Sequence, residues 1–454
     1  MSLNLTATVD AAADRRGLVL LTLCLGVLVA QVDTSVVNLA ARPIGLAFHA
    51  SVTALQWVLD AYNLAYAVLL LSGGLCADVF GRRRVFQAGA AIIAAASIAC
   101  VFAPNIGLLI VARAATGVGS AMLLPASLAI VRVVWPDQAA RRRALGVWAS
   151  CNGLAFVVGP TLGGVLIGRC GWQSVFLLAV PLAVAAFILA RTVVPESADP
   201  TGRSLDLSGQ ILGAAALGGL VFAVIAFRDG GQAWIVSLAV TLLATPLFLR
   251  VQHRKATTAL VPLDLFRGPP FRGAVAATAA MTFGIYGMIF LLPLVWQSSG
   301  YLTSQQAGLA LMPCALLFFL VAPRSGHLAQ RIGARASTAG GTAIVGSGLL
   351  VLSFTHLGQP FLLTQLGLAM TGVGMGINTG PLTAVAVEAV RPERAGTAAS
   401  VINVARMAGA TMGVAMLGAT FTLAGGGAPG FQVAMLLGGL VQLCGAAAAW
   451  RTIR

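Results

Sequence analysis

The chain contains fourteen runs of about 20 apolar residues, separated by short polar connections. A helix of about 20 residues crosses the hydrocarbon core of a bilayer and satisfies its own backbone hydrogen bonds there. Only 9% of the 454 residues are charged, whereas a soluble domain needs roughly a quarter. The runs occupy residues 17–39, 55–76, 84–103, 107–131, 143–167, 174–194, 208–227, 233–251, 271–296, 305–323, 337–355, 360–385, 397–423 and 430–450. This pattern predicts an all-α membrane protein with fourteen transmembrane helices.

Parts of the first half of the sequence return in the second half. The stretch 74–83 (GLCADVFGRR) returns about 250 residues later as 326–335 (GHLAQRIGAR), and a TGVG segment occurs in both halves. Repeats of this kind are typical of secondary transporters, in which two halves enclose a cavity. We expect a six-helix bundle at 1–194 and a second one at 271–454. Residues 195–270 would supply a cytoplasmic linker, two extra transmembrane helices and a second linker.

Arginine residues are concentrated in alternate connections between the runs, and the other connections hold only Arg42, Arg169 and Arg228. Because cytoplasmic loops retain an excess of Lys and Arg, we expect a multi-pass protein of the cytoplasmic (inner) membrane with both termini cytoplasmic. The same bias accounts for the formal net charge of +15. A nucleic-acid-binding protein would gather its charges on one soluble face, so we expect no nucleic-acid partner.

Four charged residues lie deep inside apolar runs: Asp33, Asp60, Arg113 and Arg406. A charge at the centre of a bilayer costs about 2.5–3.5 kcal/mol even on insertion scales, so such residues are usually functional. From the helix rise, the first three lie roughly 8–9 Å below the same membrane face. A buried carboxylate beside a guanidinium is poised between its neutral and ionised forms. We expect Asp33 to be the primary proton carrier, Asp60 a second carboxylate or cation contact, and Arg113 the charge that tunes both.

A structural alternative is that Asp60 and Arg113 form a static ion pair that holds helices together. Position 113 corresponds to about Leu368 in the second half, so the arginine is absent from the other copy. A purely architectural arginine would be expected in both copies. Arg406, beside Asn403, is either a substrate contact or part of a pair directed toward the cytoplasm.

Several segments together resemble a known family. The loop 74–83 is similar to the signature loop of the major facilitator superfamily, and segment 159–164 (GPTLGG) resembles that superfamily's antiporter motif. Segments 33–40 and 55–62 resemble the fourteen-helix drug/proton antiporters in particular, as do residues 292–301. The resemblance implies the major facilitator superfamily fold, with two pseudo-symmetric six-helix bundles plus two extra central helices.

In the resembling family the signature loop latches one conformation from the cytoplasmic side. The matching residues are Gly74, Asp78, Gly81, Arg82 and Arg83. An acid at a helix end accepts from backbone donors and pairs with an arginine, while the glycines permit close backbone approach. An alternative reading is a cluster of orientation charges, which would not require Asp78.

The antiporter motif matches Gly159, Pro160, Gly163 and Gly164. A proline removes a helix hydrogen bond and small residues permit tight helix packing. Ordinary small-residue packing is the alternative, and only the resemblance makes this segment an antiporter signal.

Aromatic and amide side chains within the runs are candidates for lining a substrate cavity. Aromatic faces attract cations and bind apolar bodies loosely, although any single aromatic could instead face lipid or a neighbouring helix. The candidates are Gln31, Asn38, Trp57, Asn63, Asn152, Phe156, Phe283, Tyr286, Phe290, Gln297, Asn378, Asn403 and Arg406.

The missing motifs limit the energy source. The sole lysine, Lys255, follows Arg254, so there is no phosphate-binding loop of a primary pump. The seven cysteines show no metal or disulfide spacing, and no nucleophile and base stand together, so we expect no metal, no cofactor and no enzyme activity.

These observations favour a proton-coupled antiporter that exports hydrophobic or cationic drugs or antibiotics by alternating access. Its partners would be a small-molecule substrate, protons and the lipid bilayer, and the chain would act as a monomer. A dedicated exporter of one endogenous metabolite or antibiotic remains an alternative. A non-transporting membrane sensor or scaffold is a further one.

Overall fold

The computed structural model describes residues 2–199, 206–227, 231–255, 259, 261–355, 361–391 and 394–453, without the side chains of 2–14, 142 and 152. The described residues contain fourteen helices long and apolar enough to cross a membrane. They contain no strand. The predicted fold class is therefore confirmed.

The first six spans are single helices. The second to sixth begin and end within five residues of the predicted boundaries, whereas the first, predicted over 17–39, extends well beyond both ends of that range. Ser51, Asn105 and Asp137 each accept the backbone N–H three residues further on, which satisfies a free donor at a helix start. The helices are α1 (Ser2–Phe48), α2 (Val52–Phe80), α3 (Arg82–Val101), α4 (Ile106–Val134), α5 (Gln138–Cys170) and α6 (Ser174–Val193).

The extra hairpin consists of α7 (Leu207–Ala226) and α8 (Ala233–Lys255). The buried carboxylate of Asp206 caps α7 at the Gly209 N–H and also accepts from Lys255 and Gln252 at the end of α8. Gln210 of α7 hydrogen-bonds to Ser72 and to the Val68 carbonyl of α2. The hairpin is thus closed at its own base and attached to the first bundle.

The second bundle follows the short helix η2 (Leu263–Arg267). Its tenth span was predicted as one helix over 305–323, but it is broken into four pieces and extends to Ile332. Pro313 and Pro323 stand at the start of a piece, where the missing N–H of proline costs no helix bond. The elements are α9 (Pro269–Ser298), α10 (Ser304–Ala310), α11 (Met312–Val321), η3 (Ala322–Arg324), α12 (Ser325–Ile332), α13 (Ala334–Ser353), α14 (Phe361–Glu388), α15 (Ala395–Leu423) and α16 (Gly427–Thr452).

The internal repeat reappears as equivalent packing in the two halves. A Cβ added at Gly163 of α5 would lie 2.1 Å from Val36 of α1, and one at Gly413 of α15 would lie 2.0 Å from the carbonyl oxygen of Phe283 of α9. Both helices therefore approach their partners at a glycine. Gly81 and Gly333, which separate α2 from α3 and α12 from α13, have φ values of 104° and 87°. Only glycine adopts such a backbone without strain.

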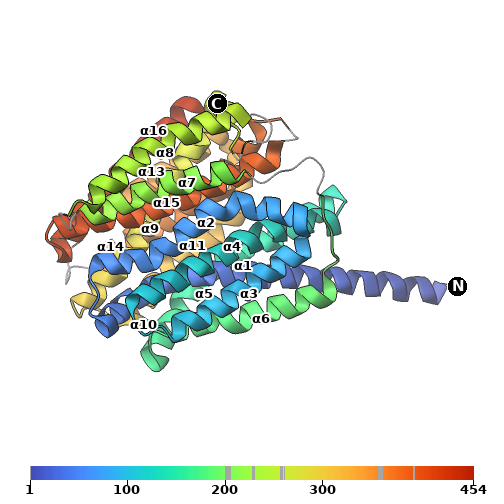
Figure 1. Ribbon diagram of the computed structural model, residues 1–454, viewed down its shortest axis with the longest axis horizontal. Coiled ribbons are helices and arrows are strands. Elements are labelled where there is room, and N and C mark those ends of the chain that lie inside the picture. Colours follow the sequence, from blue (N-terminus) through green and yellow to red (C-terminus); the bar gives the residue numbers. More distant parts are fainter. Residues whose placement is uncertain are drawn as a thin grey trace.

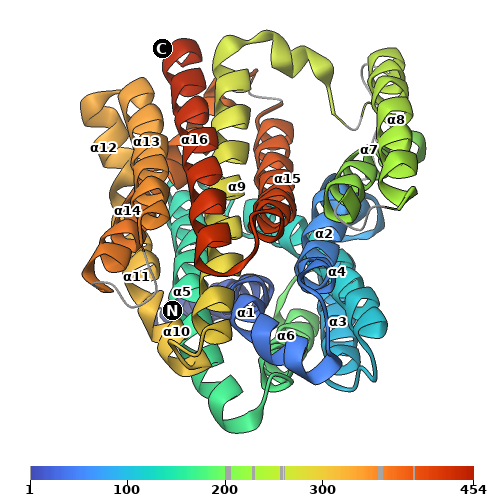
Figure 2. The same cartoon turned by 90° about the vertical axis from the view of Figure 1, so that its left-hand side faces the viewer.

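The two bundles meet at the end of the molecule where α1 ends and α2 begins, which we call the α1–α2 end. Gln56 of α2 donates to the carbonyls of Val414 and Ala415 of α15, and Gln297 of α9 donates to the carbonyl of Leu39 of α1. Figure 2, viewed from this end, shows α15 beside α2 and α5 beside α10 and α11.

The bundles diverge toward the opposite end, the α2–α3 end, as Figure 1 shows. There the guanidinium of Arg132 approaches Gly396 at the start of α15. Helix α7 covers the seam between α2 and α15 from the side, where its Val221 and Ile225 pack on Ala415. The described conformation is therefore closed at the α1–α2 end.

Candidate functional site

Arg113 and Asp33 form an ion pair in the interior of the first bundle. Arg113 Nη1 lies 2.6 Å from Asp33 Oδ2, and both side chains are 1% exposed. Arg113 Nε also donates to the Val58 carbonyl of α2 at 3.1 Å. Two charges in so dry a place persist only when each is compensated, so the pair ties α1 to α4.

Tyr62 of α2 supports this ion pair from one side. The Arg113 guanidinium lies 4.7 Å from the centroid of the Tyr62 ring, an arrangement in which the ring face attracts the cation. The Tyr62 hydroxyl lies 2.9 Å from Ser120 Oγ and 3.1 Å from the Ala30 carbonyl oxygen. Tyr62 is not among the site residues predicted from the sequence, although its place two residues after Asp60 was a usable signal.

Asp60 does not pair with Arg113, so the static Asp60–Arg113 pair considered from the sequence is wrong. The Asp60 side chain is 0% exposed, and neither carboxylate oxygen has a hydrogen-bond partner among the described residues. Asn63, about one turn further along α2, also has a buried side-chain oxygen without a partner in that part of the chain. The centre of α2 therefore carries two polar groups whose bonding capacity is unused.

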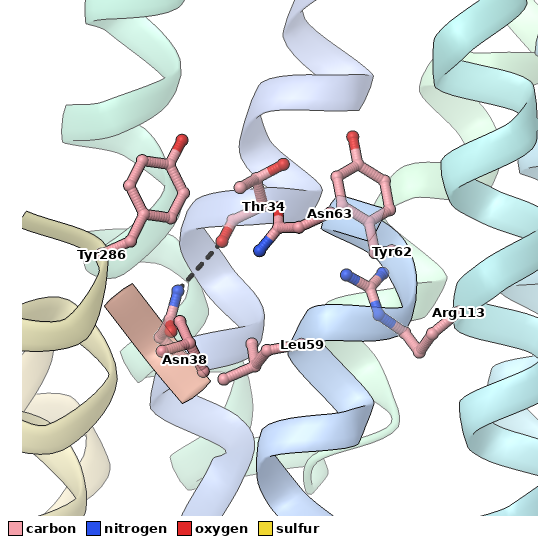
Figure 3. A pocket seen from close by; sticks show the side chains of 8 residues that line it. Thr34, Asn38, Leu59, Tyr62, Asn63, Arg113 and Tyr286 are labelled. Atoms are coloured by element: carbon pink, nitrogen blue, oxygen red, sulfur yellow. Dashed lines mark hydrogen bonds between the residues drawn. The ribbon is translucent and has the colours of Figure 1, made fainter. Parts of the chain in front are cut away.

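A small pocket lies where the two bundles face each other (Figure 3). Its volume is about 10 Å³, close to the least that holds one water molecule. Asn38 and Tyr286 are among its lining residues, and Asn38 Nδ2 donates to the Thr34 carbonyl at 3.0 Å. The lining residues come from α1, α2, α4, α9 and α15, and they are Thr34, Asn38, Leu59, Tyr62, Asn63, Arg113, Tyr286 and Val414.

Of the substrate candidates, Asn38, Asn63 and Tyr286 line this pocket. Trp57 packs 5.5 Å from Phe222 of α7, and Phe156 packs 5.7 Å from Phe318 of α11, both measured between ring centroids. These two aromatics contact other helices across the seams between the parts of the protein.

Other candidates lie away from the pocket. Asn378 is fully buried between α14 and α13, where it bonds to Thr342, and Phe290 is fully buried in the apolar core. Gln297 bridges Leu39 and Ser304 at the α1–α2 end. These side chains find their hydrogen-bond partners or apolar contacts in the packing between helices. Their presence inside an apolar run is thus explained without a substrate.

The remaining candidates are distributed along α1, α5, α9 and α15. Phe283 is buried on α9 where Gly413 approaches it, whereas Gln31 and Asn403 are partly exposed. The side chain of Asn152 lies outside the described residues. Arg406 is partly exposed, but its Nε is buried and has no partner in the described chain.

The glycines of segment 159–164 press α5 against both bundles. A Cβ at Gly159 would lie 1.9 Å from Ser35 Oγ, two residues from Asp33, and one at Gly164 would lie 2.9 Å from the Ser304 carbonyl of α10. The carbonyl of Pro160 in turn approaches Gly308 of α10. This segment therefore packs α5 tightly against α1 and against α10 of the second bundle.

The loop around Gly81 is held by its own residues and by the segment after α6. Arg82 pairs with Asp78 at 2.9 Å, and the Arg82 N–H donates to the Ser197 carbonyl at 2.8 Å. Gly74 contacts Pro125 of α4. The loop thus joins α2 and α4 to the beginning of the linker.

Glu196 is a second functional candidate that was not predicted from the sequence. Its carboxylate accepts the Arg83 N–H at 3.1 Å and lies 3.6 Å and 3.7 Å from the guanidinium groups of Arg83 and Arg84. The available signal was an acid three residues beyond the end of α6, in a chain with three consecutive arginines at the same membrane face.

Comparison with known proteins decides the family. The family model described as Major Facilitator Superfamily matches residues 23–414. The chain belongs to this superfamily. It is 36% identical over 408 residues to the multidrug resistance protein Stp of Mycobacterium tuberculosis, a match covering 88% of this chain and 75% of that protein. It is also 31% identical over 463 residues to the methylenomycin A resistance protein of Streptomyces coelicolor, covering 99% and 95%.

The fold comparison agrees with this assignment. A bacterial homologue of the human lysosomal transporter Spinster, solved in an inward-facing and occupied conformation, aligns with a TM-score of 0.67 at 17% identity. The alignment covers 96% of this chain and 97% of that one. The resemblance to the major facilitator superfamily is confirmed, and the protein is a multi-pass membrane transporter of that superfamily.

Proposed function

We propose that this transporter is a proton-coupled antiporter that exports hydrophobic or cationic compounds from the cytoplasm. The observation that carries the proposal is the buried Asp33–Arg113 pair together with the buried Asp60, whose oxygens have no partner among the described residues. A static scaffold has no use for an uncompensated acid, because burying one costs far more than burying an apolar residue. An acid that takes up and releases a proton during transport, by contrast, must be buried without a permanent counter-ion.

The two acids take different roles in the proposed cycle. In the described conformation Asp33 is ionised, because Arg113 neutralises it at 2.6 Å. Asp60 is neutral and carries a proton, since no cation compensates a charge there and a buried acid without compensation neutralises instead. When Asp33 takes up a proton, its attraction to Arg113 weakens, and the contact between α1 and α4 loosens.

The arginine distribution supports an assignment of the α2–α3 end to the cytoplasm, with both termini on that side. The contacts of Gln56, Gln297 and Gly164 would then close the outer side, and the described conformation would face inward. In the proposed cycle Asp33 loses its proton inward, cargo enters from the cytoplasm or inner leaflet, and protonation from outside accompanies its release.

Two elements would control the passage between conformations. The glycine segment 159–164 forms the outer seal, which must separate for release. The loop of Gly74, Asp78, Gly81, Arg82 and Arg83, held by Glu196, forms a latch on the cytoplasmic side. Both positions agree with the roles that the superfamily resemblance implies.

Cargo would bind where the pocket of Asn38, Asn63 and Tyr286 widens. A pocket of about 10 Å³ is far too small for a drug-sized molecule, since pockets for such ligands measure roughly 300–1,000 Å³. The bundles, which already diverge toward the α2–α3 end, must therefore move further apart there during binding.

The names of the relatives support drugs or antibiotics as cargo, since Stp is a multidrug resistance protein and the other confers methylenomycin A resistance. A panel of fluorescent cations and neutral drugs, tested for efflux from cells that lack other pumps, tests this part. Export of several unrelated compounds is expected. Export of one compound alone would favour a dedicated exporter, and export of none would contradict the proposal.

The coupling is tested with Asp33→Asn in the same cells. We expect gradient-driven efflux, measured per amount of protein in the membrane, to be lost, because asparagine fills the same volume but carries no proton. Asp264→Asn, at an exposed position in η2, is the matched control. Efflux by Asp33→Asn at the wild-type rate would contradict the role of Asp33.

A further inference from the structure

Arg406 of α15 is a charged group that the proposed proton cycle does not use. It makes no hydrogen bond and no ion pair with any described residue, and its Nε is buried without a partner. A guanidinium remains protonated under all ordinary conditions. The side chain as a whole is partly exposed, so its remaining N–H donors are accessible. The protein thus maintains a permanent positive charge in its interior with no counter-ion in the described chain.

The position of Arg406 places it where the bundles face each other. Its neighbours Val404 and Met407 pack into the apolar cluster of the first bundle. Its charge interacts with the phenol groups of Tyr66 on α2 and Tyr286 on α9, and Tyr286 also lines the pocket of Figure 3. Arg406 is not itself a lining residue of that pocket, but it lies on the same face of α15 between the bundles, with Tyr286 between it and the pocket's other lining residues as the shared neighbour.

The second bundle has no carboxylate in its membrane-spanning part that could pair with this arginine. Between residues 269 and 454 the acidic residues are Glu388 and Glu393, both close to the connection between α14 and α15. In the first bundle Asp33 already binds Arg113. A guanidinium whose Nε is buried without a partner is costly, and its two neighbouring tyrosines supply only dipoles. A soluble anion that enters the cavity would remove this cost.

We propose that Arg406 binds a carboxylate on the cargo, and that the preferred cargo is an amphiphile that carries such a group, alone or together with a basic group. A guanidinium presents two parallel N–H donors that match the two oxygens of a carboxylate. The rings of Tyr66 and Tyr286 would contact the apolar body beside it. This inference rests on the proposed function, because it assigns the ligand chemistry of the same cavity.

The test compares rhodamine B, which carries a free carboxylate, with its ethyl ester, which does not. Purified full-length protein in nanodiscs of phosphatidylcholine binds each dye in a fluorescence anisotropy titration, without a proton gradient and without anionic headgroups. We expect the wild type to bind the acid at least about tenfold more tightly than the ester, as for one charge-assisted hydrogen-bonded pair. Arg406→Gln should lose this preference, and Arg406→Lys should retain part of it.

Arg267→Gln removes the same charge at an exposed position in η2 and serves as the matched control, which should bind both dyes as the wild type does. Equal binding of acid and ester by the wild type would overturn the proposal, as would an unchanged preference in Arg406→Gln. Equal losses for both dyes in Arg406→Gln and in Asp60→Asn would show instead that Arg406 pairs with Asp60 in another conformation. Binding of the two dyes is measured without a proton gradient. The preference for the acid is therefore tested separately from proton coupling, and either can fail without the other.

Discussion

Arg113 of α4 and Asp33 of α1 lie 2.6 Å apart and are each 1% exposed, and no second acid among the described residues joins this ion pair. Asp60, on the helix between them in sequence, has both oxygens unbonded in the described part of the chain. The two acids at this depth are therefore in different states: one is compensated by a cation and one is not. The proposed coupling of proton movement to transport depends on this difference between Asp33 and Asp60.

Removal of the arginine should destabilise the protein strongly. Arg113→Gln leaves the Asp33 carboxylate buried without compensation, which costs about 3–5 kcal/mol. The double variant Asp33→Asn/Arg113→Gln should recover most of this loss, because two neutral amides replace the two charges. Thermal unfolding in detergent measures both effects. A single variant as stable as the wild type would show that the pair does not hold α1 to α4.

Substitution of Gly159 should disturb the packing of α5 on α1. In Gly159→Ala the new Cβ would lie 1.9 Å from Ser35 Oγ, and overpacking of this kind costs about 1–3 kcal/mol. Gly168→Ala is the matched control on the same helix, since nothing lies within 4 Å of its Cβ. We expect a lower unfolding temperature and slower efflux for Gly159→Ala only. Ser35→Gly should partly restore it, and equal behaviour of the two alanine variants would contradict the close approach.

Loss of Glu196 should loosen the linker from the loop around Gly81. Glu196→Gln removes the ion pairs with Arg83 and Arg84, which are partly exposed and therefore worth about 1 kcal/mol or less. Hydrogen exchange of residues 194–199 should become faster while global stability changes little. Glu388→Gln removes an exposed acid at the same end of the molecule and should leave this exchange unchanged. Unchanged exchange in Glu196→Gln would refute the attachment.

The base of the α7–α8 hairpin should depend on Lys255. Burial raises the pKa of the Asp206 carboxyl, but the hydrogen bonds from Lys255, the Gly209 N–H and Gln252 outweigh it and hold that pKa below its usual range. A lowered pKa in the folded state means that the stabilisation is present above the ordinary value, about 3.9, and is lost only as the pH falls through the lower folded value.

Lys255→Met should therefore reduce stability by about 1–3 kcal/mol near neutral pH, and Lys255→Arg should reduce it less. The unfolding temperature of each variant, followed as a function of pH, measures this. The difference between wild type and Lys255→Met should persist down to about pH 4 and shrink only in stronger acid. A difference that vanishes already at pH 6 would contradict the ion pair with Asp206.

The apolar runs and the repeat were sufficient to predict the fourteen spans and the fold class, because membrane helices need length and hydrophobicity and little else. The break of the tenth span was not predicted. Pro313 and Pro323 lie within or beside an apolar run of ordinary length, and a proline inside a membrane helix often leaves it continuous. Only the surrounding packing decides between a kink and a new helix start.

Depth along each helix placed Asp33, Asp60 and Arg113 at one level, but it did not show which acid meets the arginine. That choice depends on the rotation of α2, which turns Tyr62 toward Arg113 and leaves Asp60 without a partner among the described groups. A rotation of this kind comes from side-chain packing between helices. The same limit explains why Asn378 and Phe290 were placed in a cavity although both lie inside the second bundle.

Proton movement driven by cargo tests the central claim most directly. Purified protein is reconstituted into liposomes that contain a pH-sensitive dye, and an exported compound from the efflux panel is added on one side. The wild type should move protons in the opposite direction to the compound, whereas Asp33→Asn should bind the compound and move no protons. Proton movement by Asp33→Asn equal to the wild type, or cargo movement by the wild type without protons, would contradict the account.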